Sequence, residues 1–317
     1  MAETDKNLNG IVCINKAAGI TSFGVCKKIR ELTGTRKVGH MGTLDPMATG
    51  VLPIMVGRAT RFLDYVPNSD KGYRASFRLG EKTDTLDSTG TVTEKRDVNV
   101  TEGEVEEAFN SFFGEIEQIP PMYSAVQVDG KRLYEYARHG EKIDRKPRKV
   151  EIKYISVVEY DNETHEGMVD VLCSKGTYIR SLIDDAGEKL GCGAVMTALQ
   201  RIYAMGFSID DAIEIEKLQY AADVGADFSD YFTPVDIVLK QYVAIYLNEK
   251  QSNTFRNGGS LVAANIDTEY EIEHNKYYRV YDHKKRFMGL GRGVVYEGER
   301  AKRNGPMLVV EKMYITG

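Results

Sequence analysis

Hydrophobic and polar residues alternate over several short segments in the first two thirds of the chain. Residues 73–79 alternate without interruption, which predicts a half-buried strand. Residues 11–14 and 168–173 also have strand-like sequences. Residues 126–130 predict a strand and a turn, and we expect the basic residues that follow to form an exposed excursion.

Other segments carry apolar residues at helical spacing. Ser22 is placed to cap a helix that ends before Gly34. Thr101-x-x-Glu104 forms a capping box ahead of a second helix, and Thr177 opens a third. Strands and helices alternate irregularly, with hairpin-type signals between them. The pattern therefore favours an α+β fold, a mixed sheet flanked by helices, over a doubly wound parallel sheet.

The pattern changes near residues 232–235. Beyond them, short strand-like runs at 277–281, 293–296 and 307–310 are separated by Gly, Asn and charged residues, which predicts a small, mostly β domain. The glycine-rich run 289–293 lacks the βαβ context and the glycine spacing of a nucleotide-binding fingerprint. We expect it to be a turn at the end of a strand.

Composition narrows the class of protein. A chain of 317 residues suggests one large domain and a smaller one. No window approaches the roughly 18 apolar residues of a membrane span, and the polar start is no signal peptide. The four cysteines lie far apart and accompany only scattered histidines. This spacing indicates reduced thiols in a cytoplasm and argues against a zinc site.

The charge is unevenly distributed. The net charge is −5, but residues 16–40 hold six Lys and Arg against one Glu, and residues 131–153 hold nine against four acids. Phosphate binding depends on the local field, so an acidic protein with two basic stretches can bind RNA. The alternative is that each stretch is an ordinary solvated surface.

A single carboxylate, Asp45, occupies the most constrained loop of the chain, within residues 38–57. Glycines surround it and Pro46 follows it, so the backbone there is tightly specified. This constraint indicates that the position of the acid matters as well as its charge. The alternative interpretation is an Asp that caps a turn, but His40 lies five residues earlier in the same loop.

The residues around Asp45 resemble the active-site motif of the bacterial tRNA pseudouridine-55 synthases, which isomerise one uridine in the T-loop of tRNA. Five blocks resemble that family in the same order, and together they span about residues 10–210. One departure is Ala17, where the family usually has Pro. The blocks are 15–22 (NKAAGITS), 39–50 (GHMGTLDPMATG), 71–75 leading to 83–87 (KGYRA and TDTLD), 120–130 (PPMYSAVQVDG) and 173–180 (CSKGTYIR).

The resemblance implies the chemistry of the site. The reaction breaks the bond from ribose to N1, turns the base and rejoins it through C5, and it requires no metal or redox cofactor. Asp45 resembles the carboxylate nucleophile that forms a covalent intermediate. Arg180 matches the arginine that holds it, because a nearby cation favours an ionised carboxylate. Without the resemblance, Arg180 would be taken for a surface ion pair.

The target base must be flipped out of the T-loop to be reached. Tyr73 matches the family's stacking tyrosine, although its alternation also fits a plain core strand. Tyr178 and Leu199 resemble the remaining wall of the uracil pocket. His40 resembles the histidine that occupies the space left by the uridine, although it would otherwise be interpreted as a turn residue.

The resemblance also implies a domain organisation and a partner. Residues 1–233 would form the catalytic domain, with 131–149 as an inserted basic segment that closes over the T-loop. Residues 236–317 would form a PUA-like RNA-binding domain that grips the acceptor stem. We expect a cytoplasmic monomer that binds the T-arm and acceptor stem of tRNA, with no DNA or membrane partner and no cofactor.

Two other classes of function stay open. One is a non-catalytic tRNA-binding or tRNA-folding protein on the same scaffold, which the presence of Asp45, Tyr73 and Arg180 disfavours. The other is an acid hydrolase, which would need a second positioned carboxylate. Asp84 and Asp87 are formal candidates for that second carboxylate, but their block is already accounted for by the resemblance.

Overall fold

The computed structural model describes residues 8–67, 69–124, 126–141, 143–227, 229–296 and 305–314, without the side chain of Arg138. Lys142, one of the residues of the predicted basic segment, lies outside the described residues. So do the polar residues at the N-terminus and residues 297–304 and 315–317 of the expected C-terminal domain.

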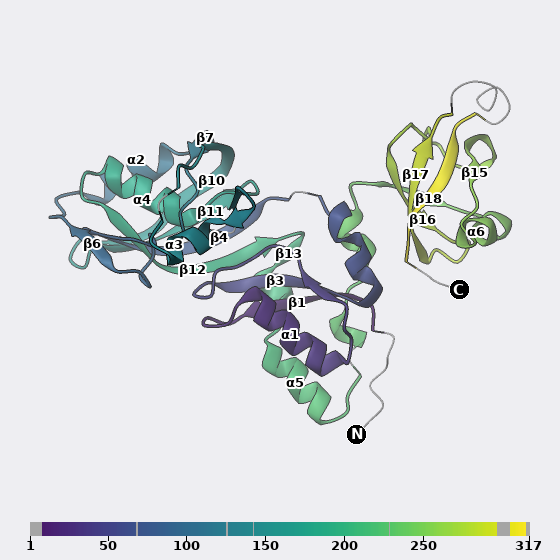
Figure 1. The fold of residues 1–317 in the computed structure, drawn as a ribbon, viewed down its shortest axis with the longest axis horizontal. Coiled ribbons are helices and arrows are strands. Elements are labelled where there is room, and N and C mark those ends of the chain that lie inside the picture. The colour runs from purple at the N-terminus through teal and green to yellow at the C-terminus, as the bar shows by residue number, and fades with distance from the viewer. Residues whose placement is uncertain are drawn as a thin grey trace.

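A nine-stranded mixed sheet forms the centre of the larger part of the molecule (Figure 1). Its main path runs in the order β1-β3-β12-β4-β11-β10-β7, while β2 pairs with β3 and β13 with β12. β3 and β12 pair in parallel, and the remaining pairs along this path are antiparallel. The strands are β1 (Gly10–Lys16), β2 (Val38–His40), β3 (Thr49–Val56), β4 (Lys71–Leu79), β7 (Gly114–Gln118), β10 (Arg148–Asp161), β11 (Glu166–Cys173), β12 (Ala194–Ala204) and β13 (Phe207–Ser208).

Two pairs of helices pack on this sheet. α2 (Glu102–Asn110) contacts β10 and α4 (Ile179–Lys189) contacts β12, whereas α1 (Ser22–Thr33) and α5 (Ile215–Asp223) lie side by side near β1 (Figure 1). Their apolar faces join the strands in one buried core, because hydrophobic residues at helical spacing gather on a single face. The predicted α+β fold, a mixed sheet flanked by helices, is confirmed.

Short elements connect this framework. A basic, exposed segment follows residues 126–130, as predicted: Lys131, Arg132, Lys146 and Lys149 are all exposed. The short elements are the hairpins β5 (Glu81–Thr83) with β6 (Val92–Lys95) and β8 (Gln127–Val128) with β9 (Lys131–Arg132), the helix α3 (Leu133–Arg138), and the 3-10 helices η1 (Gly57–Tyr65), η2 (Ile209–Asp211), η3 (Ser229–Tyr231), η4 (Val235–Leu239) and η5 (Ala263–Asn265).

The C-terminal part is a small sheet with one flanking α-helix among its described residues. Its strands follow the order β14-β16-β17-β18-β15, and this part lies to one side of the nine-stranded sheet (Figure 1). The prediction of a small, mostly β unit is confirmed. Its elements are β14 (Val243–Tyr246), α6 (Glu249–Arg256), β15 (Leu261–Val262), β16 (Tyr277–Tyr281), β17 (Phe287–Val294) and β18 (Met307–Met313).

A second hydrophobic cluster joins the two parts. It includes Phe62 of η1, Leu239 of η4 and Phe287 of β17, all of them buried. The rings of Phe62 and Phe287 lie 5.7 Å apart, within the range of favourable aromatic pairs. The hydroxyl of Tyr65 donates a 2.8 Å hydrogen bond to Glu311 across the same boundary. The C-terminal sheet is therefore packed against the larger part. Among the described helices, none is long and apolar enough to cross a membrane.

Two helix starts differ from the prediction. Thr21, not Ser22, caps α1, because its side chain accepts from the Gly24 amide at 2.9 Å. α4 begins at Ile179, two residues after Thr177, whose hydroxyl donates instead to the Ser174 carbonyl. The hydroxyls of Ser22 and Thr177 are used elsewhere, so neither caps its helix.

The prediction of a turn at residues 289–293 is also wrong, because this glycine-rich run lies inside β17. The strand expected at 293–296 therefore ends at Val294 and begins earlier, at Phe287. Gly289 has φ +148°, and a Cβ placed there would collide with the Lys312 carbonyl of β18. The glycine permits a close approach of two backbones.

Candidate active site

A cavity of about 500 Å³ opens where the Asp45 loop meets β4, β12 and the start of α4. Its lining includes all six side chains selected from the sequence, contributed by segments up to about 160 residues apart in the chain. These are His40, Asp45, Tyr73, Tyr178, Arg180 and Leu199.

Buried side chains hold the backbone of the Asp45 loop from behind. The ammonium group of Lys16, fully buried at the end of β1, donates to the carbonyls of Pro46 at 3.1 Å and Ile20 at 2.7 Å. Ser22 accepts from the Leu44 amide at 2.9 Å and donates back to its carbonyl at 3.1 Å. The peptide groups on both sides of Asp45 are therefore fixed.

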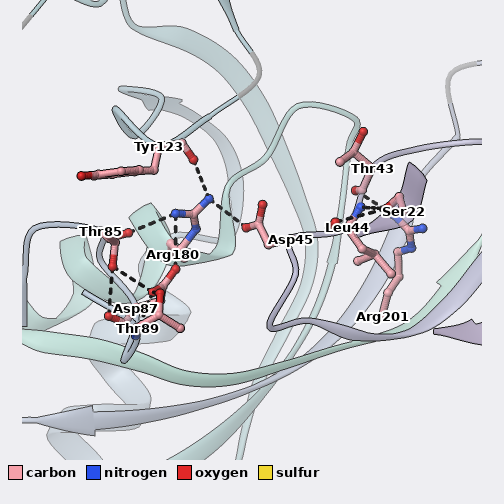
Figure 2. Close-up of polar contacts among 10 residues, drawn as sticks. All are labelled: Ser22, Thr43, Leu44, Asp45, Thr85, Asp87, Thr89, Tyr123, Arg180 and Arg201. Carbon is pink, nitrogen blue, oxygen red and sulfur yellow. Dashed lines mark hydrogen bonds and ion pairs between the residues drawn. The ribbon is translucent and has the colours of Figure 1, made fainter. Parts of the chain in front are cut away.

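Arg201 of β12 holds the same loop from the other side. This fully buried guanidinium donates to the carbonyls of Val51 at 2.7 Å and Gly42 at 3.2 Å. It also donates to the Thr43 carbonyl at 3.4 Å (Figure 2). The backbone of Arg201 also requires glycine at position 50, because a Cβ there, at φ +97°, would collide with the Arg201 carbonyl. The glycine of the motif thus brings β3 against β12.

The Asp45 side chain points towards Arg180 (Figure 2). Arg180 Nη2 lies 2.8 Å from Asp45 Oδ2, and the two side chains are 6% and 39% exposed. The Asp is therefore open to the cavity, while the Arg is buried behind it. This burial excludes the surface ion pair considered above for Arg180.

A rigid set of acceptors orients Arg180. Its guanidinium donates to the carbonyls of Tyr123 at 2.9 Å and Thr85 at 3.1 Å, and Nη1 lies 3.4 Å from Asp87 Oδ2 (Figure 2). Asp87 is itself buried and accepts hydrogen bonds from the amide and hydroxyl of Thr89. A buried arginine with carboxylates on two sides keeps its charge compensated. Arg180 can hold Asp45 without moving from its own site.

The acid-hydrolase alternative finds no support in this geometry. Asp87 is fully engaged with Arg180, Thr85 and Thr89. Asp84 accepts from the backbone of Thr91 at 2.8 Å. Neither is among the residues that line the cavity, so Asp45 has no second acid facing it across the described part of the pocket.

Tyr73 and Leu199 come from neighbouring strands. Leu199 of β12 is in register with Ala75 of β4, two residues from Tyr73, so both side chains reach the same face of the sheet. Tyr73 also belongs to the main core, so the core-strand interpretation and the pocket position both hold. Burial raises the pKa of Tyr73 to about 12, which keeps its hydroxyl protonated.

His40 and Tyr178 complete the wall. His40 ends β2, and its buried Nδ1 has no partner among the described residues. Burial, with Arg201 nearby, lowers the pKa of His40 below its ordinary value, so the ring is neutral near pH 7. Tyr178 precedes α4, where buried Gln118 accepts from its amide at 2.9 Å and donates to its carbonyl at 3.2 Å.

The sequence pattern indicates no role for Lys16 or Arg201 and offers Asp87 only as a formal second carboxylate, although Lys16 and Asp87 lie inside the motif blocks given above. Arg201, two residues beyond Leu199 on β12, had no such signal. The departure at Ala17 leaves the loop intact, because Ala17 is exposed and its carbonyl accepts from Lys16 at 2.9 Å. Within the described residues, no group of three or more His, Cys, Asp or Glu side chains is placed to hold a metal ion.

Residues 30–179 match a family model described as "TruB family pseudouridylate synthase (N terminal domain)". Residues 180–240 match "tRNA pseudouridylate synthase B C-terminal domain". The strands from Val243 onward lie beyond both matches.

Whole-chain similarity extends further. The tRNA pseudouridine synthase B of Clostridium perfringens (strain 13 / Type A) is 42% identical over 286 residues, covering 90% of this chain and 95% of the relative. That of Clostridium novyi (strain NT) is 40% identical over 308 residues, covering 97% and 100%. A chain of the crystal structure of a Cbf5-Nop10-Gar1 complex matches with a TM-score of 0.71 and 25% identity, covering 96% of this chain and 85% of that one. With relatives this similar along almost its whole length, the chain belongs to the TruB family of tRNA pseudouridine synthases.

Proposed function

We propose that this chain converts uridine-55 in the T-loop of tRNA to pseudouridine, with Asp45 as the nucleophile. The observation that carries the assignment of Asp45 is its position: a carboxylate open to a pocket, held 2.8 Å from a buried arginine by a loop whose backbone is fixed on both sides. Such preorganisation suits a nucleophile that must meet its target at a defined place.

The reaction is an isomerisation, so its atoms balance without a co-reactant. The bond between N1 and the ribose C1′ breaks, the base turns while it stays in the pocket, and a bond forms between C5 and C1′. C5 then loses its proton and N1 gains one. Asp45 forms a transient covalent bond to the sugar carbon or to the base, and that bond is broken again before product leaves.

The other pocket residues receive roles from their positions. Tyr73 would stack on the flipped base, and stacking worth roughly 1–3 kcal/mol offsets a flipping cost of a few kcal/mol. Leu199 and Tyr178 would form the wall around the uracil. His40, neutral and with Nδ1 unpartnered among the described residues, would occupy the place that the uridine leaves in the T-loop. Arg180 would keep Asp45 in position.

The partner is tRNA, bound through its T-arm and acceptor stem. The basic segment 131–149, most of whose described basic residues are exposed, would close over the T-loop. Residues 236–317, whose described part forms the C-terminal sheet, would act as a PUA-like domain on the acceptor stem. We propose that the protein works in the cytoplasm without DNA or membrane partners. It would work as a monomer, because a single chain supplies every selected residue of the pocket.

The direct test is incubation of the purified chain with an unmodified T-arm stem-loop, followed by chemical mapping of pseudouridine. The expected result is one pseudouridine, at the position of uridine-55. A stem-loop that binds but stays unmodified would favour the alternative, a non-catalytic tRNA-binding or tRNA-folding protein. Modification at another uridine would contradict the assigned position.

A further inference from the structure

The pocket has a second polar region that the proposed roles do not use. Lys71, the first residue of β4, lines the cavity two positions before Tyr73, on the same face of the strand. Its ammonium group lies near the Asp45 loop, 3.5 Å from where a Cβ on Gly42 would be. Across the described residues, this ammonium group makes no hydrogen bond or ion pair.

The charges around Lys71 are mostly of its own sign. Arg201 faces it from β12 and Lys175 from the loop after β11, while the Cys173 thiol of β11 is the group that favours its protonation. Burial and these two cations lower the pKa of Lys71 to about 8. Lys175 also lines the cavity. An ammonium group that is partly desolvated and has no counter-charge among the described residues is stabilised when an anion binds beside it.

We propose that Lys71, assisted by Lys175, binds the phosphate next to the flipped uridine. The inference rests on the proposed function, because the flipped nucleotide is what brings an anion into this cavity. The uracil and the ribose offer only neutral acceptors, whereas a phosphate carries a full charge and several acceptor oxygens. Fixing that phosphate beside Tyr73 would position the sugar relative to Asp45, so Lys71 is a positioning residue.

The test measures binding of a T-arm hairpin that carries one uncharged methylphosphonate, placed either 5′ or 3′ of the target uridine. Each test hairpin also carries a 2′-O-methyl ribose beside the methylphosphonate, so that no 2′-hydroxyl can attack it. A hairpin with the same 2′-O-methyl ribose and only normal phosphates is the reference. For the unaltered protein, one of the two methylphosphonates should weaken binding roughly 10- to 100-fold, the range for removal of a hydrogen bond to a charged group.

Lys71→Met removes the charge but keeps the length of the side chain. It should weaken binding of the normal hairpin by a similar factor and reduce the log–log salt slope by about 0.7–0.9. In this variant the same methylphosphonate should weaken binding little further, because the phosphate at that position has already lost the Lys71 ammonium. Lys189→Met, at the exposed far end of α4, is the matched control and should leave the effect of the methylphosphonate unchanged.

The pH dependence is an independent readout. Phosphate binding raises the pKa of Lys71 above the value of about 8 in the free protein, so affinity is full below pH 8 and falls as the pH rises above it. Lys71→Arg should keep binding and flatten this fall. Burial also lowers the pKa of Lys16 to about 8. Because Lys16 is present in the unaltered protein and in Lys71→Arg, its contribution to the pH dependence cancels when the two are compared.

The phosphate assignment would be overturned if the loss of affinity in Lys71→Met simply added to the loss caused by each methylphosphonate. An unchanged salt slope in Lys71→Met would also overturn it. If Lys71→Met does not fold, the unaltered protein decides, because the methylphosphonate hairpin should bind without the fall above pH 8. If the effects of Lys71→Met and of one methylphosphonate do not add, but no pseudouridine forms, the phosphate site stands and the proposed activity is rejected. If pseudouridine forms but the two effects simply add, the proposed activity stands and the phosphate site is rejected.

Discussion

At the scale of single residues, three buried polar side chains explain how one exposed carboxylate is held in place. Lys16, Ser22 and Arg201 direct their hydrogen bonds to backbone carbonyls and amides of the Asp45 loop. A buried polar group is stable only when it is paired, so these interactions fix the loop against them. Their role is structural, and in the proposed reaction the chemistry belongs to Asp45.

Arg201→Met should lower the free energy of unfolding by at least about 3 kcal/mol, because it leaves three carbonyls of the loop without their buried donor. Urea unfolding of both proteins measures the difference. Arg74→Met is the control, since Arg74 makes an exposed ion pair with Asp170, and such pairs contribute about 1 kcal/mol or less. A loss for Arg201→Met no larger than the control would contradict its role.

His40 makes a prediction about pH. Its pKa in the folded protein lies below the ordinary 6.5, so between those values the unfolded chain binds a proton that the folded chain does not. Stability from this group therefore falls as the pH drops through 6.5. His40→Gln should reduce the loss of stability between pH 7 and 5, and urea unfolding at each pH measures it. His283→Gln, at an exposed position, should not reduce that loss.

The site residues that the sequence identifies make different kinds of interaction from those that it misses. Asp45 and Arg180 stood out because their types suit a reaction and because their motif resembles a known family. Arg201 did not, because its partners are backbone carbonyls, which every residue has. Lys71 likewise lies in a quoted block, but its lack of a partner among the described residues is visible only when the fold is known.

At the scale of elements, periodicity predicted the strands well and the helix starts less well. The alternation over residues 73–79 and the capping box at Thr101 both appear as expected. The predicted helix starts at Ser22 and Thr177 are wrong because a hydroxyl can bond either to a helix end or to another partner, and local sequence does not distinguish the two. The long pairing of β12 with β4 and β3 had no local signal.

The basic segment gives a prediction at this scale. Replacing Arg145, Lys146, Arg148 and Lys149 together with Gln should weaken tRNA binding and flatten its salt dependence. The log–log slope should fall by about 0.7–0.9 for every phosphate that the variant no longer neutralises. Arg145 also donates to the Pro120 carbonyl at 3.0 Å, so a variant that retains Arg145 separates RNA binding from support of the segment. An unchanged slope in both variants would mean that the segment is an ordinary solvated surface that does not bind RNA.

At the scale of the whole molecule, the C-terminal sheet is joined to the larger part, which holds the nine-stranded sheet, by a hydrophobic cluster. Leu239 of η4 and Phe287 of β17 pack with Phe62 of η1, so the connection after Thr233 is part of a core. Thr233 itself exchanges backbone hydrogen bonds with Ile11 of β1. Separate roles for the two parts therefore have to be tested with a fragment that retains η4.

A fragment ending at Lys240 should fold, with a lower melting temperature because Phe62 loses part of its cover. On a T-arm hairpin its single-turnover rate should stay close to that of the full chain, whereas on whole tRNA its KM should rise more than its kcat falls. Melting curves, single-turnover kinetics on the hairpin and steady-state kinetics on whole tRNA measure this. Equal losses on hairpin and tRNA would place the C-terminal sheet at the active site.

The central claim is that Asp45 is the nucleophile of a tRNA pseudouridine synthase, and Asp45→Asn tests it most directly. The amide keeps the shape of the side chain but is no useful nucleophile. The measurement is single-turnover pseudouridine formation together with tRNA affinity, with Asp84→Asn, outside the cavity, as the matched control. The account predicts no product from Asp45→Asn, near-normal affinity and an active control. Product above a trace would contradict it, and a large loss of affinity would make Asp45 a structural residue.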